Sequence, residues 1–254
     1  LPVYVDEETG EYTQVNTPGI LAPNPVATAK EQKFNTSTSR ILGDIFGELE
    51  ILPGLKAKIS LGTDVMYMKS NTYTPSIIYQ SNGTSSATVA VNKSMNWLNE
   101  NTLTWNKTIN EIHNLNVLAG FTIQQNNIET VSASSGNFVN DVMEYNNLGA
   151  GSIYFQPGSS NLKWSLMSYL GRINYALSSK YLISVTARAD GSSRFGANNK
   201  FGFFPSGSAA WRVSEEEFMQ SLRNQISNLK LRVSYGFTGN TEIGVYESLA
   251  TLGS

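Results

Sequence analysis

Cysteine is absent from the 254 residues of this sequence, and histidine occurs once, at His113. The lack of cysteine excludes disulfide frameworks, thiolate metal sites and cysteine nucleophiles. A single histidine excludes metal sites that need two histidine ligands and leaves little room for a histidine-based catalytic triad. We interpret His113 as a solvated or capping residue beside a short turn.

Charged residues and long apolar runs are also scarce. Only 15% of the residues are charged, against about 25% in an average soluble domain. The 18 basic and 20 acidic residues give a net charge of −2, and no basic stripe is present, so we expect no nucleic-acid partner. No apolar run is long enough for a transmembrane helix, but a transmembrane strand needs only about 9–11 residues with every second one apolar.

Motifs of catalysis are missing as well. The sequence has no Gly-x-Ser-x-Gly elbow, no Gly-rich phosphate loop and no His-Glu pair at metal-binding spacing. Glu215, Glu216 and Glu217 fall in the first turn of a predicted helix, where carboxylates favour the helix dipole. We therefore expect no catalytic residue, no metal site and no cofactor.

Alternation with period two dominates the sequence from residue 40 onward. Apolar residues alternate with polar ones, and this alternation is typical of strands with one apolar face. Aromatic residues make up 11% of the chain. We expect eight antiparallel strands that neighbour one another in chain order. They span 40–51, 55–67, 95–109, 115–124, 169–175, 181–190, 203–213 and 229–237.

The connections between these strands are of very unequal length. Long polar loops are predicted at 70–93 and 127–162 and a loop of medium length at 191–200, whereas the other connections between the strands are short. Ser214 and Glu217 form a capping-box pattern before one short helix at 215–223. Loops sorted by length are typical of outer-membrane barrels, which have short periplasmic turns and longer extracellular loops.

The first 38 residues contain four prolines and many Thr, Ser and Asn. We predict irregular structure over 1–38, as an extracellular loop region, and barrel strands and loops over 39–254. The opening segment has neither the basic nor the apolar region of a signal peptide. We expect the sequence to be part of something longer.

The alternation also predicts which residues face lipid and which face the lumen. Charge on a lipid face costs roughly 2–4 kcal/mol for Lys or Arg at the bilayer midplane, so the charged set is expected inside. The outward set is Ile45, Leu49, Ile59, Leu61, Val117, Phe121, Ile173, Val185, Ala209 and Val233. The inward set is Lys58, Asp64, Arg172, Arg188 and Arg232.

Several segments resemble the SusC/RagA family of TonB-linked outer-membrane transporters. The most specific similarity is in 180–240, where the chain reads KYLISVTARADGSSRFG from Lys180, FPSGSAAWRVSEEEF from Phe204 and LKLRVSYGFTGN from Leu229. Residues 52–55 and 113–120 fit more loosely.

The resemblance implies an all-β fold, an antiparallel up-and-down segment of about eight strands from a transmembrane barrel of about 22 strands, a size at which a plug fills the lumen. It implies an importer of oligosaccharides or peptides in the outer membrane of Gram-negative bacteria, with a SusD-like surface lipoprotein and with TonB acting through a plug. The family's signal peptide, TonB box and plug are not in this sequence. The alternative is a soluble β-sandwich that binds carbohydrate.

Two groups of side chains are candidate contacts. Loop aromatics that could stack on sugar rings are Tyr73, Tyr79, Tyr145, Tyr154 and Phe155; packing within the loops is the alternative. Arg188, Asp190 and Arg194 are candidate contacts to the lumen, plug or substrate, and the alternative is that an Arg188–Asp190 ion pair fixes the loop at 191–200.

Overall fold

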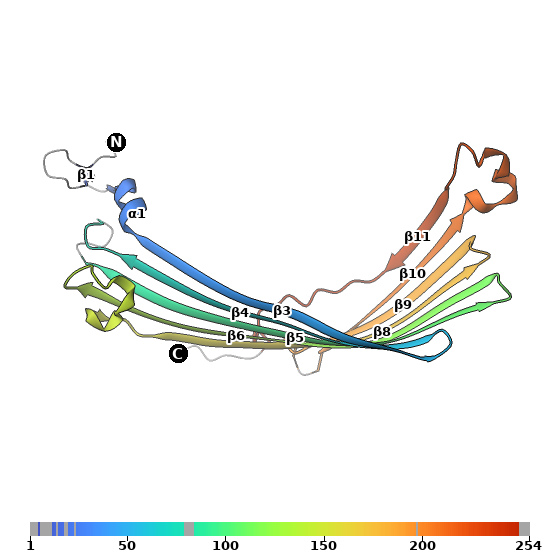
Figure 1. Ribbon diagram of the computed structural model, residues 1–254, viewed down its shortest axis with the longest axis horizontal. Coiled ribbons are helices and arrows are strands. Elements are labelled where there is room, and N and C mark those ends of the chain that lie inside the picture. Colours follow the sequence, from blue (N-terminus) through green and yellow to red (C-terminus); the bar gives the residue numbers. More distant parts are fainter. Residues whose placement is uncertain are drawn as a thin grey trace. The chain divides into compact units, whose positions relative to one another are not determined.

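The computed structural model describes residues 5, 12–13, 15–17, 20–22, 24–78, 84–196 and 198–248. Its main strands are β3 (Lys33–Leu52), β4 (Leu55–Thr74), β5 (Ser86–Ile109), β6 (His113–Phe138), β7 (Gly151–Tyr154), β8 (Gly158–Leu177), β9 (Tyr181–Ser192), β10 (Phe201–Arg212) and β11 (Lys230–Gly236). They form one nine-stranded sheet in the order β11-β10-β9-β8-β6-β5-β4-β3, with β7 added to β6 (Figure 1). The predicted antiparallel, up-and-down order of eight strands is confirmed, and two packed sheets of a sandwich are not what the described residues form.

Several strands are longer than the alternation predicts. β4 runs to Thr74, β5 begins at Ser86, β6 continues to Phe138 and β8 begins at Gly158. The loops predicted at 70–93 and 127–162 are therefore too long. Much of the added sequence is small and polar, as in SASSGN at 132–137 and GSSN at 158–161, so its alternation is weak, although Ala87, Val89 and Val91 at the start of β5 do fall at every second position. Side chains of the added residues pair across the strands, as between Asn92 Nδ2 and Thr130 Oγ1 at 3.0 Å.

Residues 1–38 are not wholly irregular, which corrects the prediction. They contain a two-stranded sheet of β1 (Val15–Thr17) and β2 (Ile20–Ala22), the helix α1 (Pro25–Glu31) and the start of β3. Asn24 caps α1, because its Oδ1 accepts hydrogen bonds from the amides of Val26 at 2.9 Å and Ala27 at 3.2 Å. The proline at the first helical position needs no amide partner there.

Tight turns join β3 to β4, β5 to β6 and β8 to β9. The predicted Pro53-Gly54 turn joins β3 to β4, and Gly54 has φ +79°. A Cβ at this position would lie 2.2 Å from the carbonyl oxygen of Asn106. Glycine is therefore required here both by the backbone conformation and by the close approach of β5.

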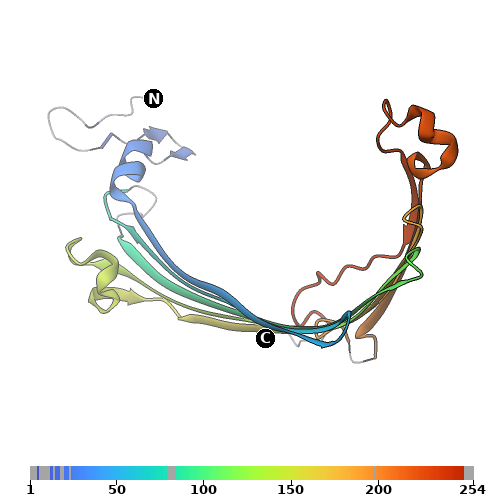
Figure 2. The ribbon, with the colours of Figure 1, turned by 45° about the vertical axis from the view of Figure 1, so that its right-hand side comes forward.

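The helix predicted at 215–223 is instead two 3₁₀ segments, η4 (Val213–Glu215) and η5 (Glu217–Leu222), beyond the ends of β10 and β11 (Figure 2). The predicted capping box is absent: Glu216 precedes η5, and no side chain caps it. The carboxylate of Glu216 is occupied by other donors, described below.

The chain divides into two compact units. Unit 1 is Leu1–Ile41, Val65–Met95 and Ile128–Leu162, and unit 2 is Leu42–Asp64, Asn96–Asn127 and Lys163–Ser254. Few apolar side chains are buried in either. Among the described residues they are Ala27, Tyr73, Ile78 and Ala87 in unit 1, and Val213 and Met219 in unit 2. Many large apolar side chains of the strands are instead exposed, such as Ile45 at 72%, Ile173 at 50% and Val233 at 76%, and apolar surface exposed on this scale implies an apolar partner.

The register of β8 to β11 separates the two faces as predicted. Ile173 lies opposite Val185, and Val233 lies opposite Ala209, all on one face. Successive side chains of a strand point to opposite faces of the sheet. Arg172, Arg188 and Arg232 therefore lie on the opposite face. Val185 and Val233 remain 55% and 76% exposed. No helix of the described residues is long and apolar enough to cross a membrane.

Candidate functional site

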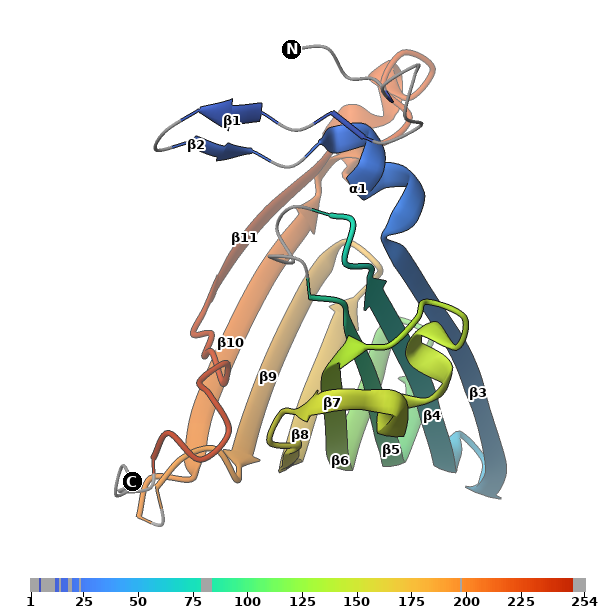
Figure 3. The same cartoon turned by 90° about the vertical axis from the view of Figure 1, so that its left-hand side faces the viewer.

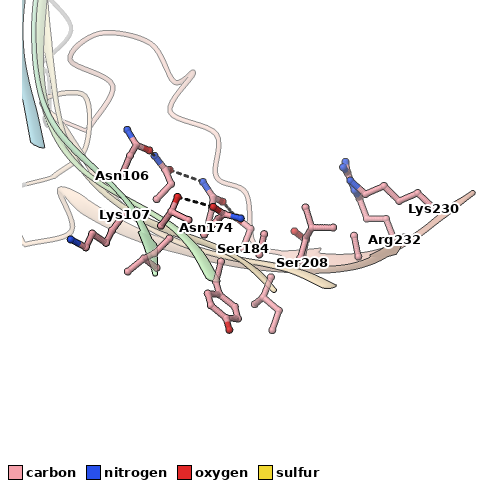
Figure 4. Close-up of a pocket in the computed structure, with 16 residues that line it drawn as sticks. Asn106, Lys107, Asn174, Ser184, Ser208, Lys230 and Arg232 are labelled. Carbon is pink, nitrogen blue, oxygen red and sulfur yellow. Dashed lines mark hydrogen bonds between the residues drawn. The ribbon is translucent and has the colours of Figure 1, made fainter. Parts of the chain in front are cut away.

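A row of amide and hydroxyl side chains crosses the polar face of unit 2 (Figure 4). Asn116 Nδ2 donates to Asn106 Oδ1 at 2.7 Å, and Asn174 Nδ2 donates to Asn116 Oδ1 at 2.9 Å. Ser184 Oγ then donates to Asn174 Oδ1 at 2.6 Å. We call these four residues the polar row. It connects β5, β6, β8 and β9 through side chains as well as through the backbone.

The polar row forms one wall of an open cavity of about 510 Å³. Ser208 lies opposite Ser184 and continues the row onto β10. Lys230 and Arg232 of β11 add two cationic side chains to the lining. Such a surface binds polar or anionic groups by hydrogen bonds and charge.

Sequence reasoning missed the polar row. It selected charged and aromatic residues, whereas an asparagine on a strand shows its partners only once the register is known. The signal was present in the short turn after β5. A tight turn at 110–112 places Asn106 and Asn116 at matching distances on either side of it.

Arg188 and Asp190 form an ion pair along the polar face of β9. Arg188 Nε lies 2.7 and 2.8 Å from the two carboxylate oxygens of Asp190, and the guanidinium also donates to Ser168 Oγ at 3.1 Å. The Arg188 side chain is 45% exposed, whereas that of Asp190 is 15% exposed. The pair therefore presents a positive group on this face.

Arg194 does not join that pair. Its guanidinium lies over the ring of Trp164, 4.8 Å from the centroid, and donates to the carbonyl of Ile243 at 3.1 Å. The three residues that the sequence grouped together therefore lie in two separate sets of contacts, one on the strand and one in the following turn.

The loop aromatics of unit 1 differ strongly in exposure, and three of them lie in the segment from the end of β6 through β7 to the start of β8, which Figure 3 shows. Tyr73 is buried, with 1% of its surface exposed, and Tyr145 is half-buried. Tyr154 and Phe155 are 71% and 50% exposed. Tyr79 lies outside the described residues.

Two of these residues fasten the segment that carries η2 (Glu144–Asn146) and η3 (Leu148–Ala150). The Tyr73 hydroxyl donates to the carboxylate of Asp141, and its ring meets that of Phe138 edge-on at 5.9 Å. Asn35 Nδ2 lies 3.4 Å from the Tyr145 hydroxyl, and Lys33 pairs with Glu144. Packing accounts for Tyr73, which lies at the end of β4 rather than in a loop, whereas Tyr145, Tyr154 and Phe155 are the candidates among the described residues that keep exposed surface.

Glu216 is a second feature that the sequence did not reveal. Its Oε1 accepts hydrogen bonds from the Tyr181 hydroxyl at 2.7 Å and from Trp211 Nε1 at 3.0 Å, and its Oε2 accepts from Lys180 Nζ at 3.1 Å. These donors stabilise the carboxylate, so they lower the pKa of Glu216 to about 2. The carboxylate therefore joins the turn after β10 to the start of β9.

His113 also has a definite partner. Its Nδ1 lies 2.7 Å from the hydroxyl oxygen of Tyr175, and the two rings stack with centroids 6.0 Å apart. In the described part of the chain no group of three or more His, Cys, Asp or Glu side chains could hold a metal ion.

Comparison with known proteins gives a consistent picture. No protein-family model matches the chain. TonB-dependent receptor P3 of Formosa agariphila is 37% identical over 246 residues, which cover 96% of this chain and 24% of that protein. TonB-dependent receptor SusC of Bacteroides thetaiotaomicron is 48% identical over 80 residues, which cover 32% of this chain and 8% of that protein. The chain thus spans about a quarter of the length of the first of these relatives.

Solved structures show the same fold. The RagAB peptide transporter matches with a TM-score of 0.81 and 24% identity, covering 92% of this chain and 26% of that one. The RagAB peptide importer in its open-open state matches with a TM-score of 0.78. On sequence and fold together, this chain is a SusC/RagA-like TonB-dependent transporter fragment.

Proposed function

We propose that the protein containing this chain imports nutrients across the outer membrane of Gram-negative bacteria, driven by TonB. The observation that carries the proposal is the two-faced sheet of unit 2. Outer-membrane strands alternate lipid-facing apolar residues with lumen-facing polar ones. The apolar face around Val185 and the polar row on the opposite face have this arrangement.

The cargo that we propose is an oligosaccharide or a peptide. Tyr154 and Phe155 are the best-placed aromatic contacts because they are exposed. Tyr145 is half-buried and offers a smaller contact surface. An exposed aromatic face stacks on sugar rings and packs equally well against peptide side chains. The relative that is a peptide transporter supports the second class.

The proposed partners are a SusD-like surface lipoprotein, TonB acting through a plug, and membrane lipid. The polar row, Arg188 and Asp190 are the surface that we propose meets the plug or the passing substrate, because the Arg188 side chain is 45% exposed and its guanidinium has N–H donors beyond those bonded to Asp190 and Ser168. Arg194 contributes less, since its guanidinium is already engaged by Trp164 and Ile243. We propose no catalytic step, and the whole protein acts by binding and gated passage.

Uptake by cells that carry the full-length gene tests this function. Deletion of the gene, or of TonB, should abolish uptake of labelled members of an oligosaccharide and peptide panel, and the protein should fractionate with the outer membrane. Replacement of Tyr154 and Phe155 by alanine should weaken uptake, whereas the control Val139→Ala, at a residue 95% exposed, should not. Uptake that survives loss of TonB, or a protein found in the soluble fraction, would contradict the proposal.

A further inference from the structure

The apolar face of unit 2 is hollowed where β9, β10 and β11 run side by side. A groove of about 320 Å³ lies there. Its apolar lining comes from Tyr181, Ile183, Ala209, Trp211, Leu231 and Val233. Cross-strand register explains the shape, because Ala209 lies between Ile183 and Val233 and its small side chain leaves space between them.

One end of this groove is polar. Tyr181 and Trp211 are opposite each other in the register and line the groove, and the polar atoms of both rings converge on Glu216. Lys180 completes the cluster, 3.1 Å from the carboxylate. Aromatic rings with an apolar body and a hydrogen-bonded tip are typical of the membrane–water interface.

The two charges at this end retain hydrogen-bonding capacity. A lysine ammonium has three N–H donors, of which Glu216 takes one, and a carboxylate offers about four acceptor positions, of which three are used here. The side chains are 27% and 15% exposed, so both can be reached from outside. Phe218, which is 64% exposed, extends the apolar surface beside Trp211, with ring centroids 6.5 Å apart.

We propose that this groove binds one acyl chain of a zwitterionic aminophospholipid, with the lipid phosphate at Lys180 and the lipid ammonium at Glu216. The inference rests on the proposed function, because it needs the apolar face to meet a membrane. Adjacent opposite charges match a headgroup that carries one charge of each sign. A purely anionic headgroup meets Glu216 as a like charge, and a choline headgroup has no N–H to donate to it.

Native mass spectrometry of the full-length transporter, delipidated in detergent, tests the proposal. The protein is titrated with phosphatidylethanolamine, phosphatidylglycerol and phosphatidylcholine of identical acyl chains. We expect phosphatidylethanolamine to bind about tenfold more tightly than the other two, which is the worth of one hydrogen bond to a charged group. The variant E216Q should bind the ethanolamine and glycerol lipids equally.

A second pair of variants separates the groove from the headgroup. Ala209→Phe fills the groove from an exposed position and should weaken binding of all three lipids. Ala119→Phe is the matched control, since Ala119 is also an exposed alanine of a membrane strand but is not part of the groove lining.

Equal binding of the three lipids by the unmodified protein would overturn the headgroup assignment, and unchanged binding by Ala209→Phe would overturn the groove. If the headgroup assignment or the groove is overturned in a protein that fractionates with the outer membrane and supports uptake, the proposed function remains intact. A protein that does not reach the outer membrane fails the proposed function instead.

Discussion

The two faces of the β8–β11 sheet are built on different principles. On one face Ile173, Val185 and Val233 lie in a band of apolar side chains with no hydrogen-bonding requirement. On the other face Asn174 and Ser184 are bound to specific neighbours, atom by atom. The apolar face is therefore tolerant of changes in side-chain shape but intolerant of charge, whereas the polar face depends on particular pairs.

This difference explains why the sheet has so little core of its own. A sandwich would bury the apolar face against a second sheet, at about 25 cal/mol for each Å² of apolar surface. Here Val185 stays 55% exposed and Val233 stays 76% exposed. In the proposed function, lipid covers the apolar face in place of a second sheet. The stability of the sheet then depends on the membrane.

Placing a charge on the apolar face should have the largest effect. Val185→Arg should cost roughly 2–4 kcal/mol near the bilayer midplane. Heat-modifiable migration of the full-length protein in gels measures the folded fraction. Ser206→Arg is the control, because Ser206 is exposed and lies opposite Thr186 on the polar face. Equal losses of folded protein for the two variants would break the distinction between the faces.

Interrupting the polar row should have a smaller effect. Asn116→Ala removes both the donor to Asn106 and the acceptor for Asn174, and two neutral hydrogen bonds contribute about 1–3 kcal/mol together. Urea unfolding in detergent micelles gives the free energy of unfolding. Asn114→Ala removes the single bond from Thr108 and should cost about half as much, so the opposite ranking would count against the row as a structural unit.

The smallest effect should come from acid. Because the pKa of Glu216 is lowered from 4.5 to about 2, its carboxylate binds fewer protons in the folded state. Its contribution to stability is complete above about pH 4.5 and is lost as the pH falls toward 2. Melting temperatures between pH 6 and 2 should therefore fall more steeply for the unmodified protein than for Glu216→Gln. Glu217→Gln is the control, and curves of identical slope for Glu216→Gln and the unmodified protein would refute the role of this carboxylate.

Strand order and the separation of faces were predictable because both follow from period-two alternation. The end of β6 was not, since the residues at 132–137 before Phe138 are small or polar on both faces. The start of β5 at Ser86 was missed although apolar residues at 87, 89 and 91 alternate there. The helix α1 is only seven residues long, too short for a periodic signal.

The candidate site was predictable only in part. Arg188 and Asp190 are two residues apart on a strand, so their shared face follows from spacing alone. The hydrogen-bond partners of Glu216 cannot be inferred from spacing, because Tyr181 is 35 residues away in the chain. Three consecutive glutamates resemble the start of a helix, and only the tertiary structure shows that one of them serves a different purpose.

Solvent accessibility measured residue by residue along β9 tests the central claim most directly. The chain has no cysteine, so single cysteines at 183–187 of the full-length protein can each carry a spin label in reconstituted membranes. The account predicts that labels at 183, 185 and 187 collide mainly with dissolved oxygen, whereas labels at 184 and 186 collide mainly with a water-soluble nickel chelate. Accessibility without alternation, or with the two sets exchanged, would contradict the assignment of lipid and lumen to the two faces.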